Sequence, residues 1–437
     1  MKVLKFGGTS VGSAERICHV ADLVEAAGRN IVVLSAMSGT TNSLVEISEY
    51  LYKGNIPGAQ EVINGLYVKY EATLRELFGS DEALHEDARR AVGRVFSLLR
   101  SYCSEPLTEA GEKEILAQGE LMSTAIMERV LTARGHNVGM LPALEFMRTL
   151  PNGEPDMQHI SSRIRRLLEL ENDADIFLTQ GYICRNDHGG IDNLRRGGSD
   201  YTASIIGAVI DAEEIQIWTD IDGMHNNDPR FVEGTKPVGS LHFEEAAELA
   251  YFGAKILHPA CVLPAKLHNI PVRLLNTLKP EAAGTLIYNT APDGTIKAIA
   301  AKDNITAIKV KSGRMLMAYG FLHKVFETFE NHRTSIDMMA TSEVGVSVTI
   351  DNDSRLAAIV DDLKQFGTVT VDKDMVIIAI VGDLEWHNCG FESKVLAALA
   401  DIPVRIISYG GSNYNISVLV SAADKVRALT ALSRHLF

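Results

Sequence analysis

Short apolar runs alternate with amphipathic stretches over the first two thirds of the chain. The runs are nearly continuous in Val, Ile, Leu and Phe, which is typical of strands buried on both faces of a sheet. The predicted strands are Lys2–Phe6, Ile31–Ser35, Asp175–Thr179, Ile215–Thr219 and Val272–Leu275. Between them, apolar residues recur at helical spacing, most clearly from Leu84 to Leu99. This alternation predicts an α/β fold in which helices cover both faces of a mainly parallel sheet.

The C-terminal third carries an internal repeat with one constant offset. Gly320-Phe321 recurs as Gly390-Phe391, and Val346-Ser347-Val348 recurs as Ile416-Ser417-Val418. Because a single offset fits every pair, a gap-free duplication explains the matches better than chance. Each copy reads strand, helix, strand, strand, helix, strand, which predicts two ferredoxin-like βαββαβ units.

These patterns predict three parts. Residues 1–295 form a large α/β domain that ends in a turn-rich linker at Pro280–Thr295. Residues 302–371 and 372–437 form the two small units, with a strand near 305–311 that both units could share.

Composition narrows the classes of partner. The net charge of −14 should repel nucleic acid and anionic membrane surfaces, and no apolar run approaches the length of a membrane span. The N-terminus, a short strand followed by glycines, predicts no signal peptide. Five cysteines without paired spacing favour a reducing cytoplasm over a disulfide framework or a zinc site. An anionic substrate would therefore need a few local cations.

A glycine-rich turn, Lys5–Ser10, follows the first predicted strand and precedes a helix. Its glycines permit conformations in which backbone N–H groups surround an anion, and the helix N-terminus adds a positive dipole. The ammonium of Lys5 could then bridge transferring phosphates. The spacing is not that of a Walker A loop. A simple strand–helix turn explains this segment equally well.

A second glycine turn, Arg195–Thr202, combines cations, backbone donors, a helix start and a carboxylate. A helix cap with Ser199 or Asp200 at the N-cap is the alternative. That alternative leaves Arg196 and the paired glycines unexplained, so a functional site is favoured.

Two further segments are weaker signals when taken alone. Trp218–Gly223 with Asp228–Arg230 lies at the end of a strand, where parallel sheets bind nucleotides, although Asp-Gly and Asp-Pro are also common turns. Phe252–Pro259 places Lys255 near a helix end, where a lysine is usually a solvated surface charge. His258 in the same segment is more consistent with a packed, hydrogen-bonded residue than with a catalyst.

Taken together and in order, these segments resemble those of the aspartokinases. The matching segments are Lys5–Ser10, Gln118–Ser123, Arg196–Thr202, Trp218–Asp220 with Asp228–Arg230, and Phe252–Pro259. The repeats resemble the paired ACT domains of that family, so the resemblance covers essentially the whole chain. It implies an amino-acid kinase fold followed by two ACT units. The implied reaction is transfer of the ATP γ-phosphoryl group to the β-carboxylate of L-aspartate, the first step towards lysine (through diaminopimelate), threonine and methionine.

The resemblance also implies roles for individual residues. Lys5 would be the catalytic lysine on the phosphates, held in place by Asp200. Arg196 would bind the α-carboxylate of aspartate and Glu120 its α-ammonium. The aspartate pocket would be completed by Ser35, Thr41, Gly197, Gly198 and Ser199. The nucleotide would contact Lys5, Gly7, Gly8, Thr9, Ser10, Thr219, Asp220, His225, Arg230, Lys255 and Ile256.

Two further expectations concern the nucleotide site. His225 stands where the family usually has tyrosine, so a contact with adenine or ribose is expected to differ. Mg²⁺ would be held mainly through the ATP phosphates, and no protein ligand is assigned to it.

The first ACT copy resembles the effector site of lysine-sensitive members. The implied effector residues are Met315, Gly320, Phe321, Leu322, Ser335, Ile336, Asp337, Thr341, Ser342 and Glu343. Asp337 and Glu343 could hold ammonium groups, whereas in the alternative view such residues merely finish strands and turns. Lysine is favoured as the effector over threonine, although Ala318 and Tyr319 depart from the expected pattern. The enzyme is expected to be monofunctional, and to form a homodimer or homotetramer through its ACT units.

Two competing functions remain open. One is another amino-acid kinase acting on glutamate or acetylglutamate, against which Gln118–Ser123 and the tandem ACT units argue. The other is a non-catalytic amino-acid sensor built on an inactive kinase fold. That reading predicts loss of Lys5, Arg196, Asp200 or Lys255, and all four are present.

Overall fold

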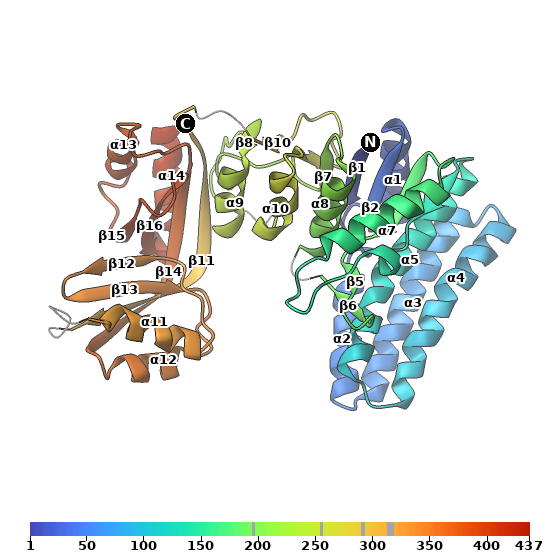
Figure 1. The fold of residues 1–437 in the computed structure, drawn as a ribbon, viewed down its shortest axis with the longest axis horizontal. Coiled ribbons are helices and arrows are strands. Elements are labelled where there is room, and N and C mark those ends of the chain that lie inside the picture. The colour runs from blue at the N-terminus through green and yellow to red at the C-terminus, as the bar shows by residue number, and fades with distance from the viewer. Residues whose placement is uncertain (195–196, 254–256, 290–292, 313–318) are drawn as a thin grey trace. The chain divides into compact units, whose positions relative to one another are not determined.

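The computed structural model describes residues 1–194, 197–253, 257–289, 293–312 and 319–437 (Figure 1). Contacts between residues divide the chain into two compact units. The first comprises Met1–Met224 and Ile256–Asn289, and the second His225–Lys255 and Thr290–Phe437. The sequence prediction assigned residues 225–255 to the first domain, but in the structure they group with the C-terminal part. Backbone bonding contributes to this grouping, since Ile299 N donates to Asn226 O over 2.9 Å.

The first unit is built on a mainly parallel sheet, as predicted. The strand order within this unit is β3-β4-β2-β1-β7-β9-β10, in which only β10 runs antiparallel to its neighbour. Its strands are β1 (Lys2–Phe6), β2 (Asn30–Leu34), β3 (Val138–Met140), β4 (Ile176–Gln180), β7 (Ile215–Thr219), β9 (Val272–Asn276) and β10 (Thr285–Tyr288). The five predicted strands are confirmed within one residue at each end. Strands β1, β2 and β4 are almost wholly buried, which explains their unbroken apolar sequences.

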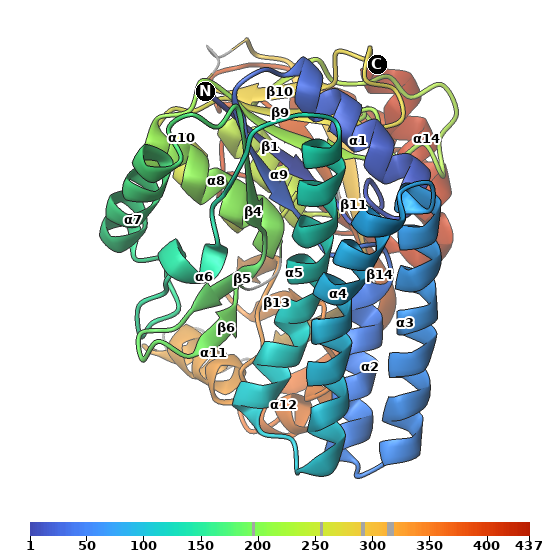
Figure 2. The ribbon, with the colours of Figure 1, turned by 90° about the vertical axis from the view of Figure 1, so that its right-hand side faces the viewer.

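Helices flank this sheet. The long helices α2 (Thr40–Tyr52), α3 (Ile56–Phe78), α4 (Glu82–Ser101) and α5 (Glu109–Ala133) lie side by side in Figures 1 and 2. The predicted helical stretch from Leu84 to Leu99 is α4. The remaining helices of the unit are α1 (Ala14–Ala26), α6 (Ala143–Phe146), α7 (Met157–Leu170), α8 (Gly198–Ile210) and α10 (Pro259–Leu267). A short hairpin, β5 (Ile183–Arg185) with β6 (Ile191–Asn193), stands apart from the main sheet.

The second unit contains the predicted repeat. Its six-stranded sheet has the order β12-β13-β11-β14-β16-β15. The strands are β11 (Ile296–Lys311), β12 (Met339–Ser342), β13 (Gly345–Ile350), β14 (Thr368–Gly382), β15 (Val404–Ser408) and β16 (Asn415–Ser421). The helices are α9 (Phe243–Tyr251), which follows the short β8 (Ser240–His242), and α11 (Phe321–Asn331), α12 (Leu356–Leu363), α13 (Phe391–Ala398) and α14 (Lys425–Leu436). Gly320 and Gly390 both have positive φ, 80° and 101°, at the N-caps of α11 and α13.

The two copies share their two longest strands, β11 and β14. Residues 305–311 of β11 serve the first copy, whereas residues 296–302 pair with residues 377–382 of β14 and fill the fourth strand position of the second copy. The prediction that 305–311 is the shared strand therefore needs correction, because both long strands change copy midway. Asn304 and Asp374 adopt equivalent left-handed conformations at these junctions, with φ of 60° and 55°.

Each copy nevertheless has its own hydrophobic core. Val325, Phe329 and Ile359 belong to the core of the first copy, and Val395, Leu429 and Leu432 to that of the second. The predicted boundaries at 302 and 371 thus fall inside or beside continuous strands rather than in linkers.

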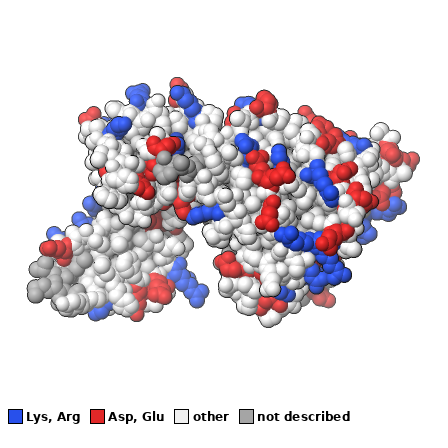
Figure 3. Space-filling model, turned by 45° about the horizontal axis from the view of Figure 1, so that its top comes forward, with Lys and Arg blue, Asp and Glu red and all other residues white. Residues whose placement is uncertain are grey.

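Charged side chains are interspersed on the described part of the face in Figure 3, where acidic and basic residues lie next to one another. Among the described residues, no helix is both long enough and apolar enough to cross a bilayer. All five cysteines are free in the structure.

Candidate functional site

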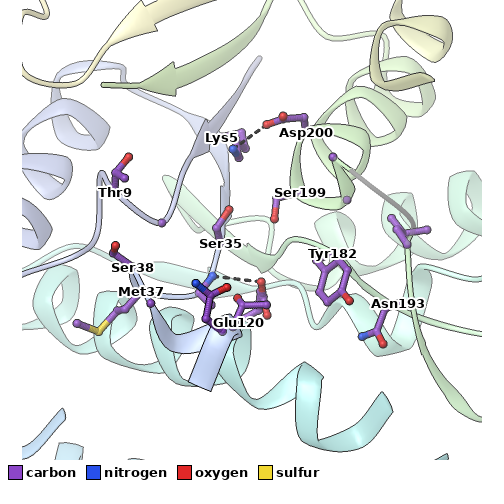
Figure 4. A pocket seen from close by; sticks show the side chains of 18 of the residues that line it. Lys5, Thr9, Ser35, Met37, Ser38, Glu120, Tyr182, Asn193, Ser199 and Asp200 are labelled. Carbon is purple, nitrogen blue, oxygen red and sulfur yellow. Dashed lines mark hydrogen bonds and ion pairs between the residues drawn. The ribbon is translucent and has the colours of Figure 1, made fainter. Parts of the chain in front are cut away.

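A cavity of about 700 Å³ opens in the first unit near the carboxyl ends of β1 and β2 (Figure 4). Its walls come from β1, the turns after β1 and β2, helix α5, the base of the β5–β6 hairpin and the start of α8. Because the strand order changes direction around β1, this edge is where an open parallel sheet binds ligands. The lining includes the predicted residues Lys5, Gly8, Thr9, Ser35, Thr41, Glu120, Gly197, Gly198, Ser199 and Asp200.

Lys5 and Asp200 form an ion pair at one end of this cavity. Lys5 Nζ lies 2.7 Å from Asp200 Oδ1, and the side chains are only 12% and 14% exposed. Lys5 stands on the central strand β1, between β2 and β7, and Asp200 lies in the first turn of α8. An acidic residue in the first turn is favoured by the helix dipole. The ammonium is therefore fixed on rigid elements beside open volume.

The turn after β1 is fixed by contacts with its neighbours. Ser38 N donates to Gly8 O over 3.0 Å, and a Cβ on Gly8 would lie 2.7 Å from Ala36 O. Ser10, which is 3% exposed, shares a 2.7 Å hydrogen bond with the hydroxyl of Thr277. Gly7 N donates to Trp218 O over 3.2 Å. Gly8 and Thr9 line the cavity, whereas Gly7 and Ser10 hold the turn against the neighbouring strands.

The second glycine turn begins α8 without a side-chain cap. Gly197 is the N-cap, with φ of 75°, and the helix starts at Gly198. The alternative reading of Ser199 or Asp200 as N-cap is wrong, because both lie inside the first turn. A Cβ on Gly197 would approach Cys261 Sγ to 2.5 Å, so this turn has room only for glycine. Arg196 lies outside the described residues.

Glu120 occupies another part of the cavity, on α5. A Cβ on Gly119 would lie 2.7 Å from Ala36 Cβ, and this close packing brings Glu120 to the turn after β2. Glu120 Oε1 accepts a hydrogen bond from Ala36 N over 3.2 Å, while Oε2 is buried without a partner. The side chain is 4% exposed, and burial raises the pKa of its carboxyl to about 7.

Sequence reasoning missed several residues of this lining, above all Tyr182 and Asn193. They lie at the base of the β5–β6 hairpin, where Leu194 N donates to Tyr182 O over 2.7 Å. Both amide atoms of Asn193 are buried and have no hydrogen-bond partner. Figure 4 shows both residues on the same side of the site as Glu120. No motif marks them in the sequence, since their place depends on how the hairpin folds back. The other missed lining residues are Ala36, Met37, Ser38, Gly39, Asn42, Lys113 and Leu194.

The remaining nucleotide predictions fall into three groups. Thr219 and Asp220 lie at the carboxyl end of β7, beside β1, where Thr219 Oγ1 donates to Asp220 Oδ1 over 3.2 Å. His225 and Arg230 belong to the second unit. There His225 Nδ1 is hydrogen-bonded to Thr235 (3.0 Å), and the Arg230 guanidinium is paired with Asp228 (2.7 Å). Lys255 and Ile256 lie outside the described residues.

The predicted effector residues lie in the first ACT copy. Gly320 caps α11, which begins with Phe321 and Leu322, and Ile336 packs against the core of this copy. Thr341 and Ser342 end β12, and Glu343 follows in the turn to β13. Asp337 follows Ser335 and Ile336 and is almost fully buried, with a side chain that is 1% exposed. Met315 lies outside the described residues.

Comparison with known proteins identifies the family. Residues 1–276 match the amino acid kinase family. Over 448 aligned residues the chain is 32% identical to lysine-sensitive aspartokinase 3 of Escherichia coli, and the match covers 100% of this chain and 99% of that protein. The chain belongs to the aspartokinases of the amino acid kinase family. Residues 378–436 also match an ACT domain, which corresponds to the second copy of the repeat.

Solved aspartokinase structures agree with this assignment. The structure of E. coli aspartokinase III in complex with aspartate and ADP (R-state) is 33% identical, with a TM-score of 0.85, and each chain covers 100% of the other. That of the same enzyme with lysine and aspartate (T-state) has a TM-score of 0.82, with 100% of this chain and 99% of that chain covered. The predicted fold class, an amino-acid kinase domain followed by ACT units, is confirmed.

Proposed function

We propose that this aspartokinase transfers the γ-phosphoryl group of ATP to the β-carboxylate of L-aspartate, giving 4-phospho-L-aspartate, in the cavity of the first unit. The observation that carries the proposal is one cavity that holds both the Lys5–Asp200 pair and a buried carboxylate with a free oxygen, Glu120. A cation for phosphate and an anion for an ammonium are what this substrate pair requires. The complex of E. coli aspartokinase III with aspartate and ADP supports the same pair of ligands.

The reaction needs no general base on the protein. The side-chain carboxylate of aspartate has a reference pKa of about 3.9, so it is already ionised at neutral pH. A carboxylate oxygen attacks the γ-phosphorus, the bond to the bridging oxygen breaks, and ADP leaves with that electron pair. The main obstacle is repulsion between the carboxylate and the phosphates. The Lys5 ammonium would reduce this repulsion, and Asp200 would keep the ammonium in position.

The other part of the cavity would bind the amino-acid head of aspartate. Glu120 Oε2 would accept a hydrogen bond from the α-ammonium. Arg196, whose role comes from the resemblance alone, would bind the α-carboxylate. Ser35, Thr41 and Ser199 would complete the pocket. The unpartnered amide of Asn193 offers an NH₂ group that donates and a carbonyl oxygen that accepts, which matches a ligand with one carboxylate and one ammonium.

The nucleotide would lie along the turn after β1. Gly8 allows close approach of the backbone, and Thr219 and Asp220 stand at the neighbouring strand end. Mg²⁺ would accompany the ATP phosphates, as it commonly does in phosphoryl-transfer sites, and would neutralise their charge. The contacts proposed for His225, Arg230, Lys255 and Ile256 stay predictions from the resemblance.

Lysine is proposed as a feedback inhibitor that binds the first ACT copy. The name of the E. coli relative and the structure of that enzyme with lysine support this effector. Association through the ACT units and a cytoplasmic location also stay predictions.

A hydroxamate assay tests the reaction directly. Enzyme, MgATP and hydroxylamine are incubated with L-aspartate, L-glutamate or N-acetyl-L-glutamate, and the acyl hydroxamate is measured. Aspartyl hydroxamate should form with aspartate alone. Product from glutamate or acetylglutamate but not from aspartate would assign the chain to another amino-acid kinase, and no product from any of them would favour a sensor.

A further inference from the structure

Asp337 of the first ACT copy is already engaged by two other side chains. Its Oδ1 lies 2.7 Å from Lys302 Nζ and accepts a hydrogen bond from the Tyr251 hydroxyl over 2.9 Å. Lys302 also pairs with Asp351 Oδ2 at 2.9 Å, and its ammonium lies 4.6 Å from the centre of the Tyr251 ring. The Asp337 carboxylate, which the sequence predicts as a group that could hold an ammonium, is therefore already paired through Oδ1.

This cluster has one cation too few. Lys302 contributes one positive charge, whereas Asp337 and Asp351 contribute two negative charges. Asp337 Oδ2 is buried and has no hydrogen-bond partner, so this oxygen of the cluster can still accept a hydrogen bond. An added ammonium at Oδ2 would satisfy that atom and balance the cluster.

The second copy lacks this cluster. At the same offset, Asp337 is replaced by Ile407, Glu343 by Asn413 and Asp351 by Ser421. The carboxylates of Asp337, Glu343 and Asp351 therefore have no counterpart at the equivalent positions of the second copy.

Tyr251 connects the cluster to a different part of the second unit. It is the last residue of α9, and Phe252 behind it is buried. Gly253 has a φ of 114°, and a Cβ there would approach Ala301 O to 2.3 Å, so the end of α9 lies directly against β11 next to Lys302. The chain then continues to Lys255, which the resemblance assigns to the nucleotide.

We propose that Tyr251 is a positioning residue that links the effector carboxylate Asp337 to the end of α9 and so carries effector binding to catalysis. This inference rests on the proposed lysine site. A lysine ammonium at Asp337 Oδ2 withdraws negative charge from the carboxylate and weakens the hydrogen bond that Oδ1 accepts from Tyr251. The end of α9 is then held less firmly. Because coupling is reciprocal, a firm Tyr251 hydrogen bond in turn opposes lysine binding.

The test is Tyr251→Phe, which removes one hydroxyl and keeps the ring against Lys302. Lysine binding is measured by calorimetry, and activity is measured at saturating lysine relative to activity without it. The variant should bind lysine at least as tightly as the wild type, while the remaining activity rises about fivefold or more, in the range typical of allosteric coupling. Hydrogen exchange of α9 should respond to lysine in the wild type but not in the variant.

Tyr409→Phe is the matched control. The Tyr409 hydroxyl donates to Leu384 O over 2.9 Å in the second copy, so the same atom is removed from a bond of equal length without a carboxylate. This control should match the wild type in binding and inhibition. Full inhibition of Tyr251→Phe, equal to that of the control, would overturn the link while leaving the lysine site intact. A wild type that neither binds lysine nor is inhibited by it would overturn both the effector assignment and the link.

Discussion

The two ends of the cavity in the first unit differ in whether a buried charged side chain has a partner of opposite charge. At one end, Lys5 and Asp200 neutralise each other at 2.7 Å. At the other, Glu120 receives a single backbone hydrogen bond and keeps a bare oxygen, near an Asn193 amide with no partner. Figure 4 shows the two ends separated by Ser35 and Ser199.

The difference indicates which groups are complete before substrate arrives. Each unpartnered buried polar group lowers stability by about 1–3 kcal/mol, so a chain retains such groups where a ligand restores the missing bonds. The Lys5–Asp200 end is preorganised for negative charge that develops during the reaction. The Glu120 end is left incomplete, and in the proposed reaction the α-ammonium of aspartate would complete it.

The largest expected effect comes from breaking the paired end. Lys5→Met should lower kcat by about 10²- to 10³-fold, because the fixed cation beside the transferred phosphoryl group is lost. Steady-state kinetics at saturating aspartate and MgATP measure this loss, and lysine binding should persist.

Lys425→Met provides a comparison for this variant. Lys425 forms an equally short pair with Asp303, at 2.7 Å, and its side chain is 10% exposed, but it lies in the second unit. The kcat of this control should stay within a few-fold of the wild type. Equal losses in the two variants would mean that Lys5 acts only through stability.

Removing the charge of Glu120 should weaken aspartate binding rather than slow turnover. Glu120→Gln removes the charged acceptor for the α-ammonium, a hydrogen bond worth about 2 kcal/mol, so KM for aspartate should rise about 30-fold. KM for ATP should change little. A variant with unchanged KM for aspartate would remove Glu120 from the substrate site.

The same variant should be more stable than the wild type at pH 8. The folded-state pKa of Glu120, about 7, lies above its usual value of 4.5, so ionisation opposes folding. Stability falls as pH rises from 4.5 to 7, and above pH 7 the ionised group costs about 3 kcal/mol, which Gln avoids. Urea unfolding at pH 8 and pH 4 measures the difference, which should vanish at the lower pH.

Acidification should have a smaller effect that depends on the same carboxyl group. Below pH 7 Glu120 becomes protonated and no longer attracts the ammonium, so kcat/KM for aspartate should fall about tenfold per pH unit. The pH profile of Glu120→Gln should lack this limb. A wild-type profile that is flat from pH 8 to pH 6 would contradict the raised pKa.

The smallest effect is expected at Asn193. Asn193→Ala should raise KM for aspartate about fivefold, the equivalent of one ordinary hydrogen bond of about 1 kcal/mol. It should also stabilise the free enzyme, because two unpartnered atoms disappear. Asn289→Ala, which removes an exposed amide bonded to Asn269, serves as the control. A destabilised variant with normal KM would show that Asn193 has a structural role.

Much of this architecture could be predicted from the sequence. Unbroken apolar runs predict the buried strands, and the constant offset between matching residues indicates the duplication. The offset could not reveal which strand completes which copy, because pairing partners are set by tertiary contacts. Lys5, Glu120 and Asp200 were found through motifs. Asn193 was missed because a single Asn before a loop carries no pattern, and its importance depends on the burial of its amide.

The effector residues show the same limit. Asp337 could be predicted as an effector residue from its neighbours along the chain, and this stays a prediction, but its contact with Tyr251 joins residues 86 positions apart. Nothing in either local sequence indicates that contact.

Strands β11 and β14 each run through both ACT copies, and this limits how the second unit can be divided. Deleting residues 296–302 would take the fourth strand from the second copy, although they precede the first copy along the chain. Ending the chain before β14 would remove the last strand of the first copy and all of the second copy except residues 296–302. The second copy is thus discontinuous, because residues 296–302 and the residues after Asp374 lie on either side of the contiguous first copy. Since both copies are built on β11 and β14, the two should fold and unfold in a single cooperative step. Swapping regulatory modules between relatives would have to exchange the whole sheet from β11 to α14.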